Sequence, residues 1–136
     1  MGFEYLEDVA IADLAFRADG KDMNELFENC ALAVAETIAD TKTIEPKIVK
    51  KLSLESTDLE QLLFIFLSEI TYFKDAELLF FSKFEVKIKD KKLTAKMYGD
   101  KINSAIKKRN DVKAITMHML KIEKKDKYYA TVVVDI

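Results

Sequence analysis

The strongest candidates for a chemical role are two aspartates at opposite ends of the chain. Asp13 lies within the apolar run Ala10–Ala18, and Asp135 follows three valines and precedes Ile136, with its terminal carboxylate. A carboxylate in apolar surroundings is costly unless a cation or a hydrogen-bond donor meets it. If the first and last strands pair, these groups form one negative pocket whose oxygens suit calcium, magnesium or manganese. The simpler alternative is that Asp13 caps a turn and Asp135 is solvated.

Two further side chains could in principle support nucleophilic chemistry. His118 is the single histidine and Cys30 the single cysteine, so no histidine cluster for a metal can form. Along its expected strand His118 shares a face with Ala114, Thr116 and Leu120, which favours a packed or surface residue over a catalytic base. Cys30 lies on the apolar stripe of the expected first helix and should pack there as a small hydrophobe. A Cys–His pair stays conceivable, but the spacing does not favour it.

Basic residues form a third candidate group. Lys107-Lys108-Arg109, expected at the tip of a polar connection over 101–111, and Lys113 could meet RNA phosphate or an acidic partner. A solvated loop is the simpler interpretation. The chain carries 22 basic and 24 acidic residues, and this formal net charge of -2 argues against tight RNA binding. The sequence contains no glycine-rich loop that could cradle a phosphate, so it predicts no nucleotide site.

The elements that must position these residues follow from the apolar periodicity. The 136 residues, 49% of them hydrophobic, fit a single domain over 1–136. We expect an extended lead-in over 3–7 and a first strand over 10–18, then a helix from Asp22 to about Asp40. A strand over 48–54 precedes a second helix, which a capping box at 57–60 opens and which should be the more enclosed of the two.

The second half of the chain alternates like strands. We expect a short buried strand or turn over 78–81, a hairpin over 84–97, a strand over 112–122 that is apolar on both faces in its middle, and a closing strand over 128–136. The order is β-α-β, then α-β-β-β-β. Strands that cluster in hairpins indicate an α+β fold with a mainly antiparallel sheet.

Localisation signals are few. A single cysteine excludes an intramolecular disulfide and favours a reducing compartment. We expect no signal peptide at the amino-terminal end and no membrane-spanning segment.

The ordered set of motifs resembles the archease family. The resemblance begins with 3–5 and 12–20, continues through the two helices at 25–31 and 62–69 and the block 111–118, and ends with Val132-Val133-Val134-Asp135-Ile136. This chain departs from the family at one place: members usually have His-Thr-Ala-Asp where this chain has Ala10-Ile11-Ala12-Asp13. The acid is kept, whereas the imidazole and the hydroxyl are absent.

The resemblance implies a cytoplasmic accessory protein rather than an enzyme. Archeases promote guanylylation and multiple turnover of RtcB-family tRNA-splicing RNA ligases, so the expected partner is such a ligase, with RNA met only indirectly and no membrane. The implied fold is a barrel-like antiparallel sheet packed with two helices, from repeated βαββ units. The implied cofactor is calcium or another divalent cation, held by Asp13, Asp135 and Ile136. Within the block 111–118, Lys113, Thr116 and His118 are the candidate partner-binding residues.

Two other function classes stay open. One is a chaperone or modulator of another RNA-processing enzyme, such as a tRNA methyltransferase. The other is a small metal-dependent hydrolase that uses Asp13 and Asp135, although the sequence near them offers no base, nucleophile or substrate-orienting group.

Overall fold

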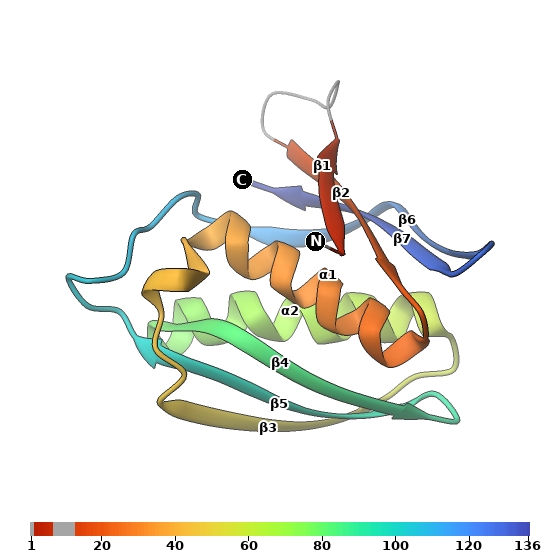
Figure 1. Cartoon of the computed structure of the whole chain (residues 1–136), viewed down its shortest axis with the longest axis horizontal. Helices are drawn as coiled ribbons and strands as arrows, with labels where there is room; N and C mark the ends of the chain where they lie inside the picture. The colour runs from red at the N-terminus through yellow and green to blue at the C-terminus, as the bar shows by residue number, and fades with distance from the viewer. Residues whose placement is uncertain (1, 7–12) are drawn as a thin grey trace.

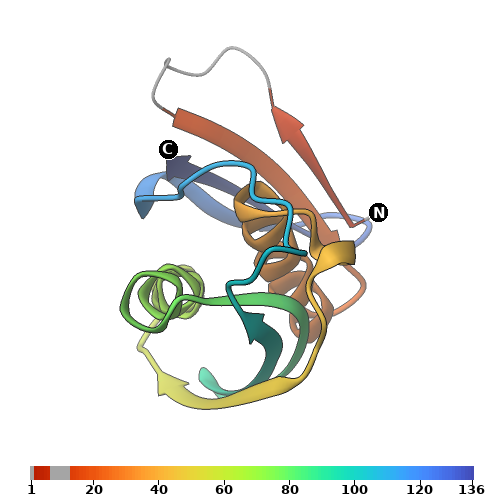
Figure 2. The same cartoon turned by 90° about the vertical axis from the view of Figure 1, so that its left-hand side faces the viewer.

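Two antiparallel sheets lie on either side of a layer of two helices in the described part of the chain (Figure 1; Figure 2). The structure is a computed structural model that describes residues 2–6 and 13–136. The first sheet has the strand order β1-β2-β7-β6 and the second the order β3-β5-β4. The strands are β1 Phe3–Leu6, β2 Asp13–Gly20, β3 Ile48–Glu55, β4 Leu79–Lys89, β5 Lys92–Lys101, β6 Ala114–Lys124 and β7 Tyr128–Asp135, and the helices are α1 Met23–Ile38 and α2 Leu59–Glu77.

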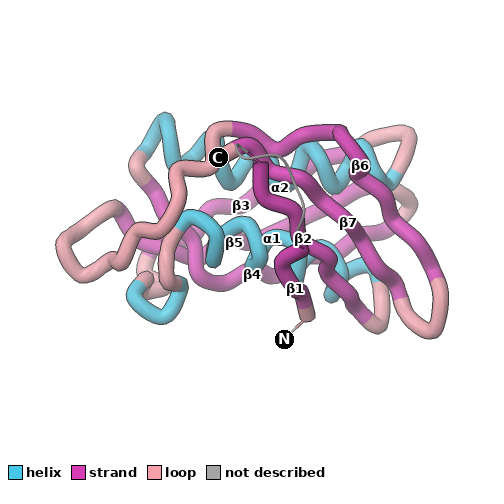
Figure 3. Tube along the Cα trace, turned by 90° about the horizontal axis from the view of Figure 1, so that it is seen from above, coloured by secondary structure: helices cyan, strands magenta, loops and turns pink. Residues whose placement is uncertain are grey.

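This arrangement confirms the predicted α+β class with antiparallel sheets. The order βαββ occurs in β3-α2-β4-β5, whose three strands form the second sheet. The last two strands return to the first sheet, where β7 lies beside β2, and the sheet covers the helices in the view from above (Figure 3). The sheets remain separate, so the barrel-like sheet is not closed. Neither described helix combines the length and the apolar character that crossing a membrane requires.

Helix α1 begins as predicted and is the more enclosed helix. The backbone N–H of Glu25 donates to Oδ1 of the N-cap Asp22 at 2.8 Å, and Oε1 of Glu25 accepts from the N–H of Lys21 at 3.1 Å. Nine of the 16 residues of α1 are buried, against seven of 19 in α2. The prediction that the second helix is the more enclosed one is therefore wrong. Alanines at 31, 33 and 35 let other elements approach α1 closely, whereas Phe64 and Ile65 of α2 stay half-buried.

The cap of α2 lies one residue later than predicted. Oδ1 of Asp58 accepts from the backbone N–H groups of Glu60 at 2.8 Å and Gln61 at 3.1 Å, so Asp58 rather than Thr57 is the N-cap. The carboxylate of Glu60 serves another element, because its Oε2 accepts from the N–H of Ile122 on β6 at 2.8 Å. Glu60 therefore accepts a hydrogen bond from the edge strand β6 of the first sheet and does not complete a capping box.

We expect Asp58→Ala to lower the free energy of unfolding by about 1 kcal/mol, since two N–H groups at the start of α2 lose their acceptor. Urea unfolding monitored by circular dichroism measures this loss. Thr57→Ala, at the exposed neighbouring position, is the matched control and should behave like wild type. A larger cost for Thr57→Ala than for Asp58→Ala would restore the original capping prediction.

The hairpin of β4 and β5 closes with a tight turn. Asp90 and Lys91 have φ values of 52° and 61°, which indicates the mirror-image turn that matches strand twist. The predicted short element over 78–81 and the first strand of the predicted hairpin are one strand, β4, interrupted by a shift of register between Phe81 and Lys83. A bulge bends a strand without ending it, which explains why the sequence suggested two elements.

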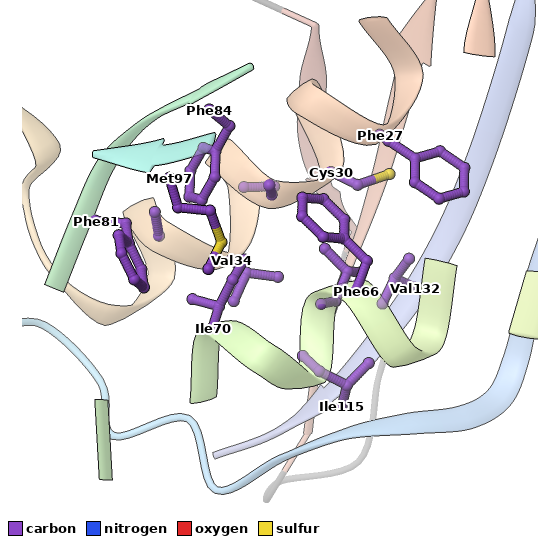
Figure 4. Close-up of a cluster of buried hydrophobic side chains, with 14 of the residues drawn as sticks. Phe27, Cys30, Val34, Phe66, Ile70, Phe81, Phe84, Met97, Ile115 and Val132 are labelled. Carbon is purple, nitrogen blue, oxygen red and sulfur yellow. The ribbon is translucent and has the colours of Figure 1, made fainter. Parts of the chain in front are cut away.

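The core between the layers is built from aromatic and aliphatic side chains of both helices and both sheets (Figure 4). The rings of Phe27 on α1 and Phe66 on α2 stack with centroids 6.1 Å apart, and both side chains are fully buried. Cys30 lies in the same cluster, as predicted. Its burial raises the pKa of the thiol, so Cys30 acts as a packing residue and not as a nucleophile.

Candidate functional site

Asp13 and Asp135 stand directly opposite each other in the first sheet. Strands β2 and β7 are antiparallel, with Asp13 paired to Asp135 and Leu14 to Val134. The sequence expectation that the first and last strands pair is therefore confirmed. Side chains of opposed residues point to the same face, with Cα atoms about 4.5–5.5 Å apart. The predicted strand residues Ala10 to Ala12, including the Ala10-Ile11 departure from the family pattern, lie outside the described residues.

The two carboxylates lie on the outward face of this sheet. Val134 belongs to the buried core and Leu14 packs against it, so the alternating neighbours Asp13 and Asp135 point away from the helices. Both aspartates are half-buried. The next opposed pair on the same face, Ala15 and Val133, is 4% and 1% exposed, which gives the acids an apolar neighbour on one side. Such surroundings increase the cost of leaving two negative charges unneutralised.

In the part of the chain that the structure describes, no basic side chain forms an ion pair with Asp13 or Asp135. The ion pairs among the described residues all involve other carboxylates. Like charges placed directly opposite each other destabilise an antiparallel pair. Two carboxylates on neighbouring strands therefore suit a bound hard cation, for which carboxylate oxygens are the preferred ligands.

The pair alone is an incomplete metal site. The part of the chain that the structure describes contains no group of three or more His, Cys, Asp or Glu side chains able to hold a metal ion. Calcium takes about six to eight oxygens. A cation between Asp13 and Asp135 would therefore need further oxygens, from the carboxyl group of the adjacent Ile136, from water or from a partner.

Two of the three candidate partner-binding residues lie beside the acid pair. The backbone N–H of Lys113 donates to the carbonyl oxygen of Asp135 at 2.8 Å. The hydroxyl of Thr116 donates to the carbonyl oxygen of Val133 at 2.9 Å. The side chain of Lys113 is exposed, whereas Thr116 is half-buried. Both residues belong to the end of the sheet that carries the acids.

His118 lies further along β6, in an irregular stretch that the sequence did not reveal. Four residues, Met117 to Leu120, stand opposite the single residue Val132, because the register jumps from Thr116 paired with Val133 to Lys121 paired with Thr131. Met119 has a φ of 60°, which alternating apolar residues do not predict. Met117 and Met119 are 52% and 64% exposed, so the prediction that the middle of this strand is apolar on both faces needs correction. The apolar side chains are there, but the bulge turns them to solvent.

The basic run at 107–109 is attached to α1 and is not a free tip. Lys107 accepts a backbone hydrogen bond from Asp40 at 2.8 Å, and the N–H of Arg109 donates to the carbonyl oxygen of Ile38 at 2.8 Å. The guanidinium of Arg109 also pairs with Oε2 of Glu36 at 2.8 Å. These contacts give hydrogen-bond partners to the backbone at and after the carboxyl-terminal end of α1, so the structure gives this run a structural role.

A buried lysine, which the sequence analysis missed, holds the same connection. Nζ of Lys74 on α2 lies 2.6 Å from Oδ1 of Asp111 and 2.5 Å from Oδ1 of Asp75. Burial lowers the pKa of the ammonium, but the two carboxylates more than offset this, so the pKa lies above its usual value. The helical spacing could have predicted this burial, because Lys74 follows Ile70 by four residues and so lies on the apolar side of α2.

Comparisons with known proteins cover nearly the whole chain. The sequence model of the Archease protein family matches residues 3–136. A protein archease from Sulfurisphaera tokodaii is 42% identical over 138 residues, which span 98% of each chain. A protein archease from Methanothermobacter thermautotrophicus is 38% identical over 129 residues, spanning 92% of this chain and 91% of its own.

Two solved structures share the fold. The solution structure of Methanobacterium thermoautotrophicum protein 1598 superposes with a TM-score of 0.86 at 38% identity, covering 99% of both chains. The crystal structure of an archease from Thermotoga maritima, described as a possible chaperone, superposes with a TM-score of 0.68 at 20% identity, covering 96% of this chain and 97% of its own. The second likeness bears on the fold alone.

Proposed function

This chain belongs to the archease family, and on that premise we propose that it is an accessory protein of an RtcB-family tRNA-splicing RNA ligase. In this proposal it works in the cytoplasm, promotes guanylylation of the ligase and restores its multiple turnover. The role does not require the protein to catalyse a reaction of its own.

The observation that carries the proposal is the direct opposition of Asp13 and Asp135 across β2 and β7. These are the two side-chain acids that the family resemblance assigns to a divalent cation, and the fold places them side by side although 121 residues separate them (135 minus 14). Two adjacent acids that no further His, Cys, Asp or Glu side chain joins among the described residues suit metal binding and presentation better than hydrolysis.

We propose that Asp13, Asp135 and the carboxyl group of Ile136 hold calcium. Bound there, calcium supplies the positive charge that offsets the opposed carboxylates and leaves coordination positions for oxygens of a partner. A site with few protein ligands binds the ion more weakly than a complete one, because calcium affinity depends on the number of charged ligands. Completion of the coordination shell by the ligase would make metal binding and docking support each other.

The docking face in this proposal is the outward end of β6 and β7 beside the acids. The exposed Lys113 lies next to Asp135, and His118 lies between the exposed Met117 and Met119. Flexible methionine side chains adapt to the surface of a partner, and such residues are frequent at adaptable binding surfaces. The ligase would therefore contact the bulged part of β6 as well as the bound ion.

The experiment that tests the function is a guanylylation assay of a cognate RtcB-family ligase under single- and multiple-turnover conditions. Wild-type protein should stimulate turnover, and Asp13→Asn and Asp135→Asn should each abolish the stimulation. Asp19→Asn is the matched control, because Asp19 lies on the same face of β2 but pairs with Lys127 at 3.2 Å.

Each other outcome has a distinct meaning. Stimulation that survives both substitutions would leave the acids a structural role and overturn the metal mechanism. Stimulation of a tRNA methyltransferase without any effect on the ligase would favour the modulator alternative. Turnover of a phosphoester substrate by this protein alone would favour the hydrolase.

A further inference from the structure

Lysines cover the outward face of the second sheet. Leu93, Ala95 and Met97 of β5 point into the core, so their alternating neighbours point away from the helices. The register of β3 and β4 with β5 extends this face across all three strands. Along 92–98 of β5 and the residues paired with it, the charged residues of this face are all exposed. They comprise the lysines Lys51, Lys83, Lys87, Lys89, Lys92 and Lys96 and the acids Glu55 and Glu85. We refer to these six lysines as the lysine face.

The positive charges of the lysine face are poorly neutralised within the protein. Lys51 stands directly opposite Lys96, and Lys89 directly opposite Lys92. Opposed like charges destabilise a sheet. Among the described residues, Lys83 is the one member of the face that forms an ion pair, with Glu85 at 4.0 Å.

The pKa of Glu85 is lowered by the positive charges around it. The hydrogen bond from the Tyr98 hydroxyl, 2.7 Å away, lowers the pKa of this carboxyl, and the ammonium groups of Lys83, Lys96 and Lys87 lower it further. One acid therefore lies within reach of lysines from two strands. The overall net charge of -2 conceals a face on which six lysines accompany two acids.

The composition of the face fits a phosphate backbone better than a protein surface. Protein–protein interfaces are depleted in lysine and enriched in aromatic residues, methionine and arginine. Nucleic-acid interfaces are more polar and much more positively charged. Lysine binds phosphate as a point charge without the geometric demands of arginine. The hydroxyls of Ser53 and Thr94, which are paired across β3 and β5, add hydrogen-bonding groups between the charges.

We infer that the lysine face binds the phosphate backbone of RNA directly, whereas the family resemblance implied only indirect contact with RNA. The face lies on the side of the molecule opposite the sheet that carries the acid pair (Figure 1). One protein could then hold RNA on the second sheet while the first sheet faces a protein partner. The choice of RNA over other polyanions rests on the proposed function, but the contact itself requires no ligase.

The test measures binding of a fluorescein-labelled, single-stranded RNA to the full chain by fluorescence anisotropy, between about 50 and 200 mM salt. Wild-type protein should bind, with an affinity that falls steeply as salt rises. The variant Lys51→Gln/Lys87→Gln/Lys96→Gln removes one charge from each strand of the face. We expect its affinity to fall about tenfold or more, and the slope of log affinity against log salt to decrease by about 2, since each single-strand phosphate contact contributes about 0.7.

A charge-matched variant separates the face from net charge. Lys42→Gln/Lys121→Gln/Lys125→Gln alters three exposed lysines elsewhere and gives the same formal net charge of -5 (-2 minus 3). It should bind RNA like wild type. Equal weakening by both variants, or failure of wild type to bind RNA at the lowest salt, would overturn the inference. Unchanged RNA binding by the face variant together with lost ligase stimulation would also overturn it, in favour of a protein partner on this face. Because no ligase is present in the binding assay, its result is independent of the guanylylation test.

Discussion

Phe66→Ala should lower the free energy of unfolding by about 3–5 kcal/mol, the range for a buried phenylalanine cut back to alanine. The Phe66 side chain is fully buried and stacks on Phe27, with ring centroids 6.1 Å apart, between α2 and α1 (Figure 4). Its removal costs both the transfer of the ring and the cavity that the surrounding layers cannot close. Stabilities of globular domains are of order 5–15 kcal/mol, so this variant should approach the limit of folding.

Phe64→Ala is the matched control for this prediction. Phe64 lies two residues earlier on the same helix and is half-buried, so the same change removes less buried area and leaves no enclosed cavity. Urea unfolding of both variants should give a loss for Phe64→Ala well below that for Phe66→Ala. Equal losses would mean that the outward side of α2 is packed as tightly as the side facing α1.

Calcium should stabilise the wild-type protein and have no effect on Asp13→Asn/Asp135→Asn. A ligand that binds only the folded state adds about 2.7 kcal/mol at a free concentration of about 100 times its Kd. For a chain of this size we expect the midpoint of thermal unfolding to rise by roughly 5–10 °C. Differential scanning calorimetry with calcium and with a chelator measures the shift.

The expected order of stability of wild type and the double variant without metal makes this prediction specific. Because opposed like charges destabilise the β2–β7 pair, replacing both acids with neutral amides should leave the metal-free protein as stable as wild type or more stable. The order should reverse when calcium is added. Asp19→Asn, on the same face of β2, should keep the full calcium response. Equal stabilisation of wild type and the double variant by calcium would place the ion elsewhere.

The fold class and the two candidate acids can be recognised from the amino-acid sequence. Apolar periodicity located both helices, because a helix that buries one side must repeat its apolar residues every three to four positions. Alternation located the hairpin of β4 and β5, since successive side chains of a strand point to opposite faces. Asp13 and Asp135 stood out because acids within apolar runs are costly to bury.

The predictions that proved wrong concern places where short-range patterns compete with packing. The capping box at 57–60 predicted Thr57 as the N-cap of α2, whereas the side chain of Asp58 accepts from the N–H groups of Glu60 and Gln61. The large apolar residues of α2 suggested an enclosed helix. Burial depends, however, on which surfaces the other elements cover, and they cover more of the alanine-rich α1. The β6 bulge depends on pairing with β7, so local sequence does not reveal it.

Which distant charges meet depends on how the elements pack and pair in the folded chain. Strand pairing set Asp13 opposite Asp135 and joined lysines of three strands into one face. The path of the chain between β5 and β6 brought Asp111 to Lys74 of α2. The two arrangements made by strands depend on register, and a slip of one residue would turn every side chain of a strand to the other face. Local preferences act within a few residues, whereas register is set by the burial of whole faces against the helices. Asp13 and Asp135 could therefore be named from the sequence, but their pairing, the lysine face and the role of Lys74 required the fold.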